Sequence, residues 1–352
     1  MSRRRILVTG GAGYIGAHLA KWLSDRGHGV VVLDNLSTGH RAALQWGELV
    51  EVDIRDRHAL FQALGQRQFD GVVHMCARSL VGESMQLPYE YYENNVGGTL
   101  NVLEWMRHVG NDRFVFSSTA AIFGNPKAPL IDEQHPKSPI NPYGRTKLMV
   151  EHLLEDAAKA YGLRSVSLRY FNACGADDSG EIGESHEPET HLIPNVLRSL
   201  LEPDWRLKIF GTDYATTDGT CVRDYIHVND LASAHELALA YLQDGQGAHA
   251  FNLGNGNGFS VKQIVEAAIQ VVDLAPQAIS LGGRRQVPVE VGAVGHRQGA
   301  GVTGHPAGRS PDGVDVEHGV GAVAQAGLAE LVGHLALEDP VAGVVGLREP
   351  HR

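Results

Sequence analysis

The stretch TGGAGYIG at residues 9–16 decides the fold that this sequence predicts. It follows an apolar run at residues 5–8, typical of a buried strand, and opens a segment at residues 14–26 with apolar side chains at helical spacing. Its glycines recur at every third position: Gly10, Gly13 and Gly16. Glycine there lets the backbone approach a pyrophosphate at a helix N-terminus, where amide groups and the helix dipole favour an anion. A dinucleotide site is indicated, although such a turn can also be purely structural, so the surrounding pattern matters.

Short runs rich in β-branched residues alternate with helical patterns through the first half of the chain. We expect strands at residues 5–8, 29–33, 49–52, 71–74, 113–117 and 164–169. We expect helices between them at residues 14–26, 58–65, 89–109 and 143–162. This rhythm predicts an α/β fold with a Rossmann-type, doubly wound parallel sheet.

The rhythm breaks after Asn172, where residues 175–190 are rich in Gly, Asp, Glu and His and predict a long surface loop. Further helices are expected at residues 191–201, 229–241 and 261–272, and further strands at 225–227 and 250–253. We therefore expect two units. They are a dinucleotide-binding Rossmann domain at residues 1–172, rejoined by part of 225–253, and a smaller α/β substrate-binding lobe at 173–285.

Composition and charge limit the kinds of partner. Of the 352 residues, 43% are hydrophobic and 20% charged, as in an ordinary soluble enzyme, and the formal net charge is −11. A nucleic-acid binder would normally present a basic face, so we expect no nucleic-acid partner. The basic N-terminus precedes an apolar run of only three residues, too short for a signal peptide, and no membrane span follows. We therefore expect a cytoplasmic protein without a membrane partner.

Three cysteines, Cys76, Cys174 and Cys221, are too few and too scattered for a disulfide framework or for paired metal-ligand spacing. No catalytic triad or metal partner is evident for them. We expect them to be reduced, buried packing residues, and we expect no metal site.

An acidic residue ends the second predicted strand. Asp34 stands where a carboxylate would accept the ribose hydroxyls of a dinucleotide, and its charge would repel an additional 2′-phosphate. NAD is therefore favoured over NADP, with a solvated loop aspartate as the alternative. Asp53 and Ile54, after the third strand, are less specific candidates for contact with the adenine edge.

The strongest constellation joins a strand end to a helix start. Ser117, Ser118 and Thr119 end the fifth strand, and the sequence YGRTK at residues 143–147 opens a helix. Tyr143 and Lys147 are four residues apart and so share one helical face. An exposed pair at this spacing is common by chance, but here it follows a dinucleotide turn and a hydroxyl-rich strand end.

This order of motifs resembles the extended short-chain dehydrogenase/reductase family, and within it the nucleotide-sugar 4-epimerases. The matching segments are HMCA at 74–77, VGES at 81–84, YYENN at 91–95, RYFN at 169–172 and GTCVRDYIH at 219–227. The resemblance as a whole runs from residue 6 to about residue 272. The resemblance implies an isomerase that interconverts UDP-galactose and UDP-glucose through a 4-keto intermediate, with transient reduction of bound NAD. It also implies a homodimer.

The resemblance assigns site residues position by position. Tyr143 would be the catalytic base, Lys147 its cationic partner, and Thr119 the hydroxyl that touches the sugar. The expected cofactor-binding residues are Gly10, Gly13, Tyr14, Ile15, Gly16, Asp34, Asn35, Asp53, Ile54, Asn95, Tyr143, Lys147, Tyr170 and Phe171. The expected substrate-binding residues are Thr119, Asn172, His191, Leu192, Phe210 and Arg223, with His191 in place of a common asparagine.

The proposed base needs a lowered pKa. A free tyrosine titrates near pH 10, about three units above neutrality. A lysine charge at about 5 Å and an effective dielectric near 20 would supply roughly two of these units, and the nicotinium charge of NAD could supply the rest. We therefore expect Lys147 to lower the pKa of Tyr143 substantially.

Two other functions share these motifs. Another nucleotide-sugar modifier, such as a 4,6-dehydratase or a decarboxylase, would use the same tyrosine and lysine. Dehydratases usually place an acidic pair after the strand-end threonine, whereas Ala120 and Ala121 follow Thr119 here. A catalytically impaired NAD-binding module is the second alternative.

The composition changes abruptly after Arg285. Residues 286–352 contain no Phe, Tyr, Trp, Ile, Met, Lys, Asn or Cys. The Arg-Arg-x-Gly-Asp segment that related epimerases carry is missing, because Arg284 and Arg285 are followed by Gln-Val-Pro. Translation of GC-rich DNA in a shifted frame would produce this bias, and an authentic divergent tail is the alternative. We expect a tail without aromatic anchors to order poorly and to weaken substrate binding.

Overall fold

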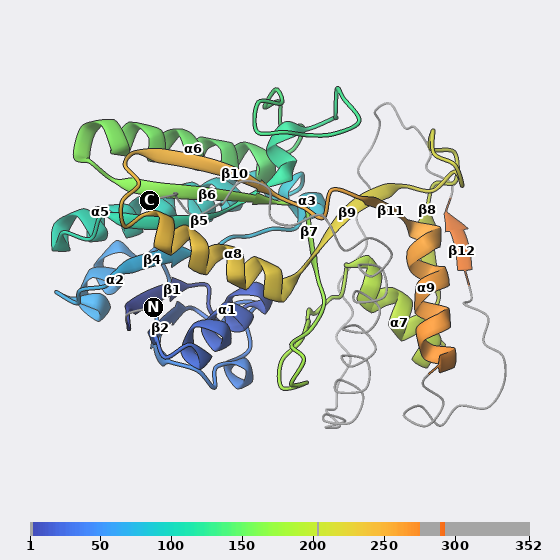
Figure 1. The fold of residues 1–352 in the computed structure, drawn as a ribbon, viewed down its shortest axis with the longest axis horizontal. Coiled ribbons are helices and arrows are strands. Elements are labelled where there is room, and N and C mark those ends of the chain that lie inside the picture. The colour runs from blue at the N-terminus through green and yellow to red at the C-terminus, as the bar shows by residue number, and fades with distance from the viewer. Residues whose placement is uncertain (1–2, 203, 275–288, 293–352) are drawn as a thin grey trace, which may run out of the picture.

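A parallel sheet of seven strands runs through the larger part of the computed structural model, which describes residues 3–202, 204–274 and 289–292 (Figure 1). The strand order is β10-β6-β5-β4-β1-β2-β3. The strands are β1 (Arg5–Thr9), β2 (Gly29–Asp34), β3 (Glu48–Glu51), β4 (Gly71–His74), β5 (Arg113–Thr119), β6 (Arg164–Tyr170) and β10 (Ala248–Leu253). The order reverses at β1, which lies between β2 and β4, and ligands of such sheets bind outside the carboxyl ends at this point.

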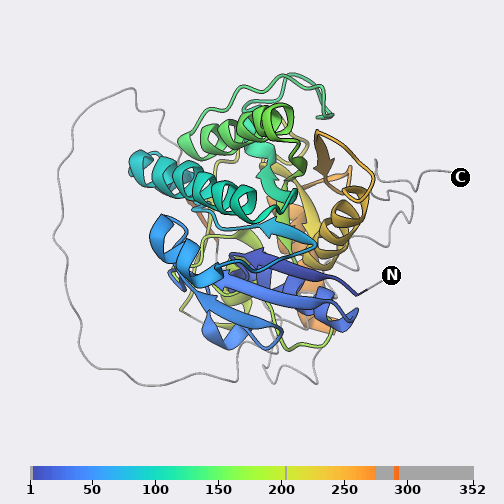
Figure 2. The ribbon, with the colours of Figure 1, turned by 90° about the vertical axis from the view of Figure 1, so that its left-hand side faces the viewer.

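Helices cover both faces of this sheet (Figure 2). One face carries α1 (Tyr14–Asp25) and α8 (Val228–Tyr241), and the other carries α2 (Arg57–Leu64), α5 (Thr99–Val109) and α6 (Pro142–Tyr161). Successive strand side chains point to opposite faces, so Ile6 and Val8 pack under α1 and α8 whereas Leu7 packs under the other three helices. We call this sheet with its five helices the body. The predicted fold class is confirmed.

Short elements complete the body. They are the 3₁₀ turns η1 (Arg41–Ala43) and η3 (Ala120–Phe123), the short helices α3 (Val81–Ser84) and α4 (Pro88–Tyr92), and the π-turn η2 (Glu93–Gly98). The single helix expected at residues 89–109 is therefore interrupted. A Cβ at Gly98 would lie 2.5 Å from the Ile54 side chain, so this glycine lets the turn pack closely. Asn95 bonds outside the helix, which also favours the wider turn.

A smaller unit lies beyond the carboxyl ends of the body strands (Figure 1). It contains β7 (Asn172–Cys174), β8 (Leu207–Phe210), β9 (Val222–His227), β11 (Gly258–Ser260) and β12 (Val289–Gly292), with α7 (Leu192–Leu201) and α9 (Val261–Leu274). β9 joins β7 and β11 in one small sheet, and β8 pairs with β12 in another. Apolar side chains of α7 and α9 form its core, which includes Val196 and Ile264. We call this unit the lobe.

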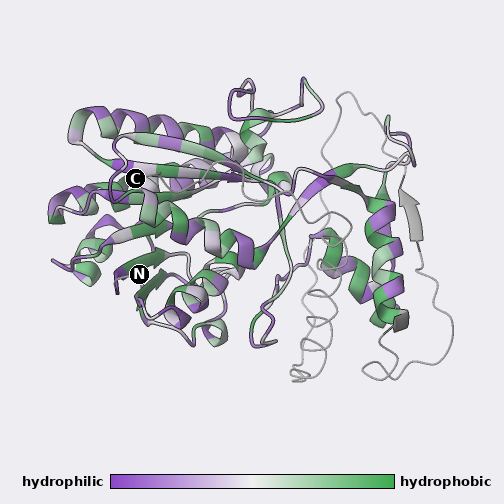
Figure 3. Cartoon of the chain, viewed as in Figure 1, coloured by the Kyte–Doolittle hydropathy of each residue, from purple (hydrophilic) through white to green (hydrophobic). Residues whose placement is uncertain are grey.

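Hydrophobic residues follow the inner strands and the inward helix faces in both units (Figure 3). No helix among the described residues is long and apolar enough to cross a membrane. The expectations for Arg284, Arg285 and most of residues 286–352 lie outside the described residues.

Candidate active site

The glycine turn connects β1 to α1 at the point where the strand order reverses. Gly10 has a φ of +74°, and a Cβ there would lie 2.7 Å from the backbone of Met75 and Cys76. A Cβ at Gly16 would lie 2.2 Å from the carbonyl oxygen of Gly10. Gly13 begins α1 without a side-chain cap, so the positive end of this helix is available to an anionic ligand. Only glycine lets the turn close this tightly.

The carboxylate of Asp34 lies beside this turn, at the end of β2. Its Oδ2 accepts a hydrogen bond from the Ala12 amide at 2.9 Å, and its Oδ1 accepts one from the Leu36 amide at 2.8 Å. A carboxylate oxygen can accept two hydrogen bonds. Asp34 is thus fixed by the backbone and keeps acceptor capacity on both oxygens, as a ribose ligand requires.

A polar group follows β2 and β3. Asn35 donates to Asp53 Oδ2 at 3.0 Å, and Arg55 Nη2 donates to the same oxygen at 2.7 Å. The hydrogen bond from Arg55 is the main reason that the pKa of Asp53 falls to about 2. Ile54 is buried next to Gly98. These residues lie at the same sheet edge as Asp34.

Helix α6 presents the tyrosine and lysine to the end of β5. The helix begins at Pro142, and Asn141 caps it by accepting a hydrogen bond from the Gly144 amide at 2.8 Å. Lys147 Nζ donates to the Ser117 carbonyl oxygen at 2.6 Å and lies 5.9 Å from the Tyr143 ring centroid. Tyr143 also has a side-chain hydrogen bond with Thr119. The predicted trio therefore comes together at the carboxyl edge of the sheet.

The predicted substrate residues after β6 occupy the lobe and its connections. Asn172 Nδ2 donates to the Asp224 carbonyl oxygen at 2.7 Å. Arg223 is exposed on β9, and Phe210 is 68% exposed at the end of β8. His191 precedes α7 at the N-cap position without a side-chain capping hydrogen bond, and Leu192, the first residue of that helix, packs on the lobe core. No hydrogen bond in the described ranges joins these residues to Tyr143 or Lys147.

Comparison with known proteins identifies the family. The model of the NAD dependent epimerase/dehydratase family matches residues 6–254. This chain belongs to that family.

Individual relatives match most of the chain. The UDP-glucose 4-epimerase of Halalkalibacterium halodurans is 53% identical over 267 residues, which are 76% of this chain and 80% of that protein. The UDP-glucose 4-epimerase of Rhizobium meliloti is 50% identical over 286 residues, covering 81% and 87%. The solved structure of the Brucella ovis UDP-glucose 4-epimerase in complex with NAD has a TM-score of 0.76 at 48% identity, covering 83% of this chain and 86% of its own. The Bifidobacterium longum enzyme in complex with NAD+ and UDP has a TM-score of 0.74 at 33% identity, covering 82% and 86%.

Burial sets the protonation of the central pair in this NAD-dependent family member. It raises the pKa of the Tyr143 phenol, and the hydrogen bond with Thr119 only partly opposes this rise. It also lowers the pKa of Lys147 to about 7. Both shifts favour the neutral side chain. The expected lowering of the Tyr143 pKa by Lys147 is not found in the protein alone, where the loss of hydration has the largest effect on this pKa and raises it.

A buried ion pair beneath the site was not anticipated from the sequence. Glu151 Oε1 accepts hydrogen bonds from Ser118 Oγ at 2.7 Å and Arg169 Nε at 2.9 Å, and its Oε2 accepts one from Arg169 Nη2 at 2.7 Å. Both charged side chains are 3% exposed. Glu151 follows Lys147 by four residues, so its place on the inward face of α6 was the available signal. The pair connects α6 to β5 and β6 and thereby positions the helix that carries Tyr143 and Lys147.

Other predicted cofactor residues hold parts of the protein together. Asn95 donates to the Arg78 carbonyl oxygen at 3.0 Å and to Thr146 Oγ1 at 3.1 Å. The Tyr170 hydroxyl forms a hydrogen bond with Ser117 Oγ. The Tyr14 hydroxyl donates to the Gly175 carbonyl oxygen at 2.5 Å. Two more complete the set: Ile15 packs against the core of the body, and Phe171 is half-buried between β6 and β7.

The expectation of three buried cysteines is correct only for Cys174. Cys76 is half-buried because it follows β4 at the sheet edge, next to the glycine turn. Cys221 is half-buried because it lies in the connection that leads into β9. The sequence placed these residues near predicted strands but did not show how much of each strand end is covered.

Proposed function

We propose that this chain interconverts UDP-glucose and UDP-galactose by oxidising and re-reducing C4 of the hexose with bound NAD. The observation that carries the proposal is the buried Tyr143 at the carboxyl edge of the sheet, hydrogen-bonded with Thr119 and flanked by Lys147. Relatives at about half identity over three quarters of the chain bear the name UDP-glucose 4-epimerase, which supports this assignment.

The side chains divide the work. Tyr143 takes the proton of the C4 hydroxyl and later returns one, while Thr119 keeps the phenol oriented and can donate to the same sugar oxygen. When protonated, Lys147 has three donors, of which one goes to the Ser117 carbonyl oxygen, so two remain for a ribose hydroxyl and the tyrosine. NAD, when bound, would supply the hydride acceptor and donor, and its positive ring would add a charge that favours the tyrosinate.

The cofactor and substrate assignments are part of this proposal. We assign the glycine turn to the pyrophosphate and Asp34 to the ribose hydroxyls. Around the cofactor we also assign Tyr14, Ile15, Asn35, Asp53, Ile54, Asn95, Tyr170 and Phe171. We assign the nucleotide end of the substrate to Asn172, His191, Leu192, Phe210 and Arg223. Tight binding of UDP with loose binding of the hexose would let the ketone turn between the two hydride transfers.

A dehydratase is the nearest alternative, and one observation disfavours it. After Thr119 the chain enters the 3₁₀ turn η3, whose first two residues are Ala120 and Ala121. Neither carries a group that could donate or accept a proton during elimination of water. Epimerisation needs no further acid-base pair at this position.

We also propose boundaries, an assembly and a location. Residues 1–172, rejoined by part of 225–253, would bind NAD, and residues 173–285 would bind the sugar nucleotide.

A cytoplasmic homodimer is our proposal for the working form. Apolar side chains exposed on two neighbouring body helices, Leu100 on α5 and Met149 on α6, support an association through that surface. Light scattering of the purified protein would test it.

The decisive assay adds UDP-galactose to the purified full chain and measures UDP-glucose without added cofactor. Turnover together with NAD released on denaturation is the expected result. Protein that carries NAD but shows no turnover would favour the impaired-module alternative. Parallel reactions with UDP-N-acetylhexosamines would define the sugar preference.

A further inference from the structure

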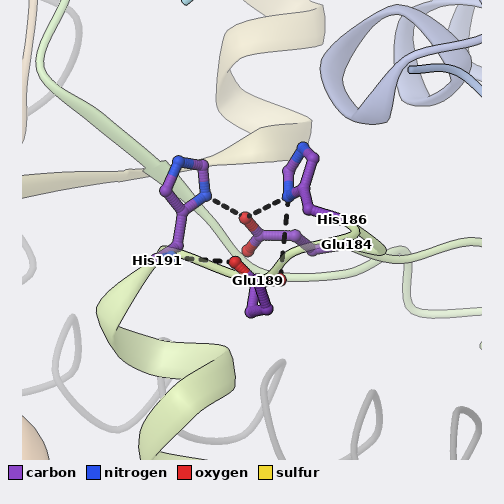
Figure 4. Close-up of side chains that lie close together, drawn as sticks. All are labelled: Glu184, His186, Glu189 and His191. Atoms are coloured by element: carbon purple, nitrogen blue, oxygen red, sulfur yellow. Dashed lines mark hydrogen bonds and ion pairs between the residues drawn. The ribbon is translucent and has the colours of Figure 1, made fainter. Parts of the chain in front are cut away.

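The loop between β7 and α7 gathers four possible metal ligands (Figure 4). They are Glu184, His186, Glu189 and His191, and one ligand atom of each lies within 4.8 Å of the others. His186 Nδ1 lies 3.3 Å from Glu184 Oε1 and 3.7 Å from Glu189 Oε2. His191 Nδ1 forms a hydrogen bond with the same oxygen of Glu184. Two imidazoles and two carboxylates thus converge on one point.

The burial of its two carboxylates distinguishes this cluster from an ordinary group of surface acids, whereas the side chains of His186 and His191 are 32% and 50% exposed. The side chains of Glu184 and Glu189 are only 3% and 5% exposed. Carboxylates removed from water need positive partners. His186 Nδ1 is buried as well and, although no hydrogen bond of good geometry forms there, it is paired with both carboxylates. The imidazoles thus supply the positive partners in the metal-free protein, and a bound ion would take over that role between the carboxylates.

Several contacts hold the four side chains in place before any ion binds. The backbone amides of Thr190 and His191 each donate to Glu189 Oε1 at 2.8 Å, which fixes that carboxylate at the start of α7. At the other end of the loop, the Tyr14 hydroxyl binds the Gly175 carbonyl oxygen at 2.5 Å. The Tyr14 ring lies edge-on to the His186 ring, with 6.2 Å between centroids. The ligands are therefore held between α1 and α7.

We propose that Glu184, His186, Glu189 and His191 form a binding site for a divalent transition-metal ion of the Zn²⁺ type. Two nitrogen and two oxygen ligands suit tetrahedral Zn²⁺. Ligand atoms about 2.0–2.1 Å from a tetrahedral ion lie roughly 3.3 Å from one another, close to the spacing around His186 Nδ1. The two carboxylates balance the charge of the ion. The hydrogen bond between His191 and Glu184 is exchanged for a bond from each side chain to the metal.

The ion would hold the loop against the start of α7 and against Tyr14, which follows the glycine turn. The expectation of no metal site considered only cysteine spacing and so did not test these side chains. The inference depends on ligand geometry and not on the proposed epimerase activity, and it gives the imidazole of His191 to the ion, so that only the backbone of this residue would remain for the nucleotide. Zinc binding without turnover, or turnover without zinc binding, would therefore separate the two proposals.

The test is a calorimetric titration of Zn²⁺ into the full chain after chelator treatment. Because the chain has 18 histidines, the informative quantity is the difference between variants and not the total metal bound. One tight ion per chain is expected in the native protein. His186→Asn and Glu184→Gln should each weaken that site by roughly 10-fold or more. The matched control His152→Ala changes an exposed histidine of α6 and should leave the tight site unaltered.

Two results would overturn the site: no tight zinc binding by the native chain, or equal tight binding by the native chain and both cluster variants. Circular dichroism and NAD content would show whether the variants fold. If they do not, Co²⁺ added to the native chain provides the second measurement. An intense visible spectrum typical of four-coordinate Co²⁺ supports the site, and a weak six-coordinate spectrum contradicts it.

Discussion

The body and the lobe hold their functional groups in different ways. In the body, Tyr143 and Lys147 are buried and already bonded to the end of β5. In the lobe, Arg223 is exposed and Phe210 has most of its surface open to solvent. Groups that are fixed in advance act on the chemical step, because no reorganisation remains to be done during reaction. Exposed groups gain their partners when a ligand binds, so they act mainly on affinity.

The largest expected effect would test the inference that buried body residues act on the chemical step. Tyr143→Phe should lower kcat by roughly 10³-fold, within the usual contribution of a general acid-base group. Bound NAD should be retained, because the ring and its place beside Lys147 remain. Rate measurements with UDP-galactose and NAD release on denaturation provide both quantities.

The matched control for that variant is Tyr161→Phe, which removes an exposed hydroxyl at the end of the same helix. It should leave kcat and NAD content unchanged. A Tyr143→Phe enzyme with normal kcat would show that the proton acceptor is another group.

The same contrast explains which residues the sequence could predict. Gly10, Asp34 and Tyr143 stand at a strand end or helix start, where local spacing and residue type determine position. The parallel sheet brings such ends to one edge, so the site of the body could be predicted together with its fold. The π-turn at Glu93–Gly98 could not, because it depends on a close contact between Gly98 and Ile54 from a distant segment.

The loop before α7 shows where sequence reasoning stops. The spacing of Glu184, His186, Glu189 and His191 follows neither helical nor strand periodicity, so no local rule places their side chains together. Their convergence depends on the path of the loop between α1 and α7. The buried Glu151–Arg169 pair has a similar cause, since its partners lie on α6 and β6 and meet only after the sheet forms.

The burial of Lys147 destabilises the folded body, which keeps this residue for its proposed chemistry. Burial lowers its pKa from 10.5 to about 7, so below pH 7 the folded protein holds an ammonium group in an unfavourable place. Since the unfolded chain binds this proton more tightly, the penalty shrinks as pH rises from the folded towards the unfolded pKa. Lys147→Met should therefore stabilise the NAD-free protein at both pH values. The gain in the free energy of unfolding should be about 3 kcal/mol smaller near pH 9.5 than near pH 6.5. Urea unfolding at the two pH values measures this difference.

The same variant should lose turnover, because the tyrosine loses its cationic partner. Lys159→Met, at a largely exposed position of α6, is the control and should show no such dependence on pH. An equal gain in stability at both pH values would mean that Lys147 is not penalised by burial.

For an exposed residue of the lobe, we expect an effect on substrate affinity. Arg223→Ala should raise KM for UDP-galactose by roughly 10- to 100-fold, the loss expected for hydrogen bonds to a charged phosphate. Its kcat should stay within about twofold of the native value. Steady-state kinetics separates the two parameters, and Arg145→Ala supplies an exposed arginine of the body for comparison. A fall in kcat with unchanged KM would contradict the inference that exposed lobe residues act mainly on affinity.

Asp34→Ala should have the smallest effect, because it removes one contact from an otherwise intact cofactor site. NAD affinity is expected to fall about 10-fold, or about 1.4 kcal/mol, since water can partly replace the carboxylate at the ribose. Discrimination against NADP should narrow, because the charge that repels a 2′-phosphate disappears. Calorimetry with NAD and NADP on nucleotide-free protein measures both affinities. Asp56→Ala also removes a carboxylate that accepts a backbone hydrogen bond, here at the start of α2, and should leave their ratio unchanged. If Asp34→Ala leaves that ratio unchanged too, the carboxylate does not select the cofactor.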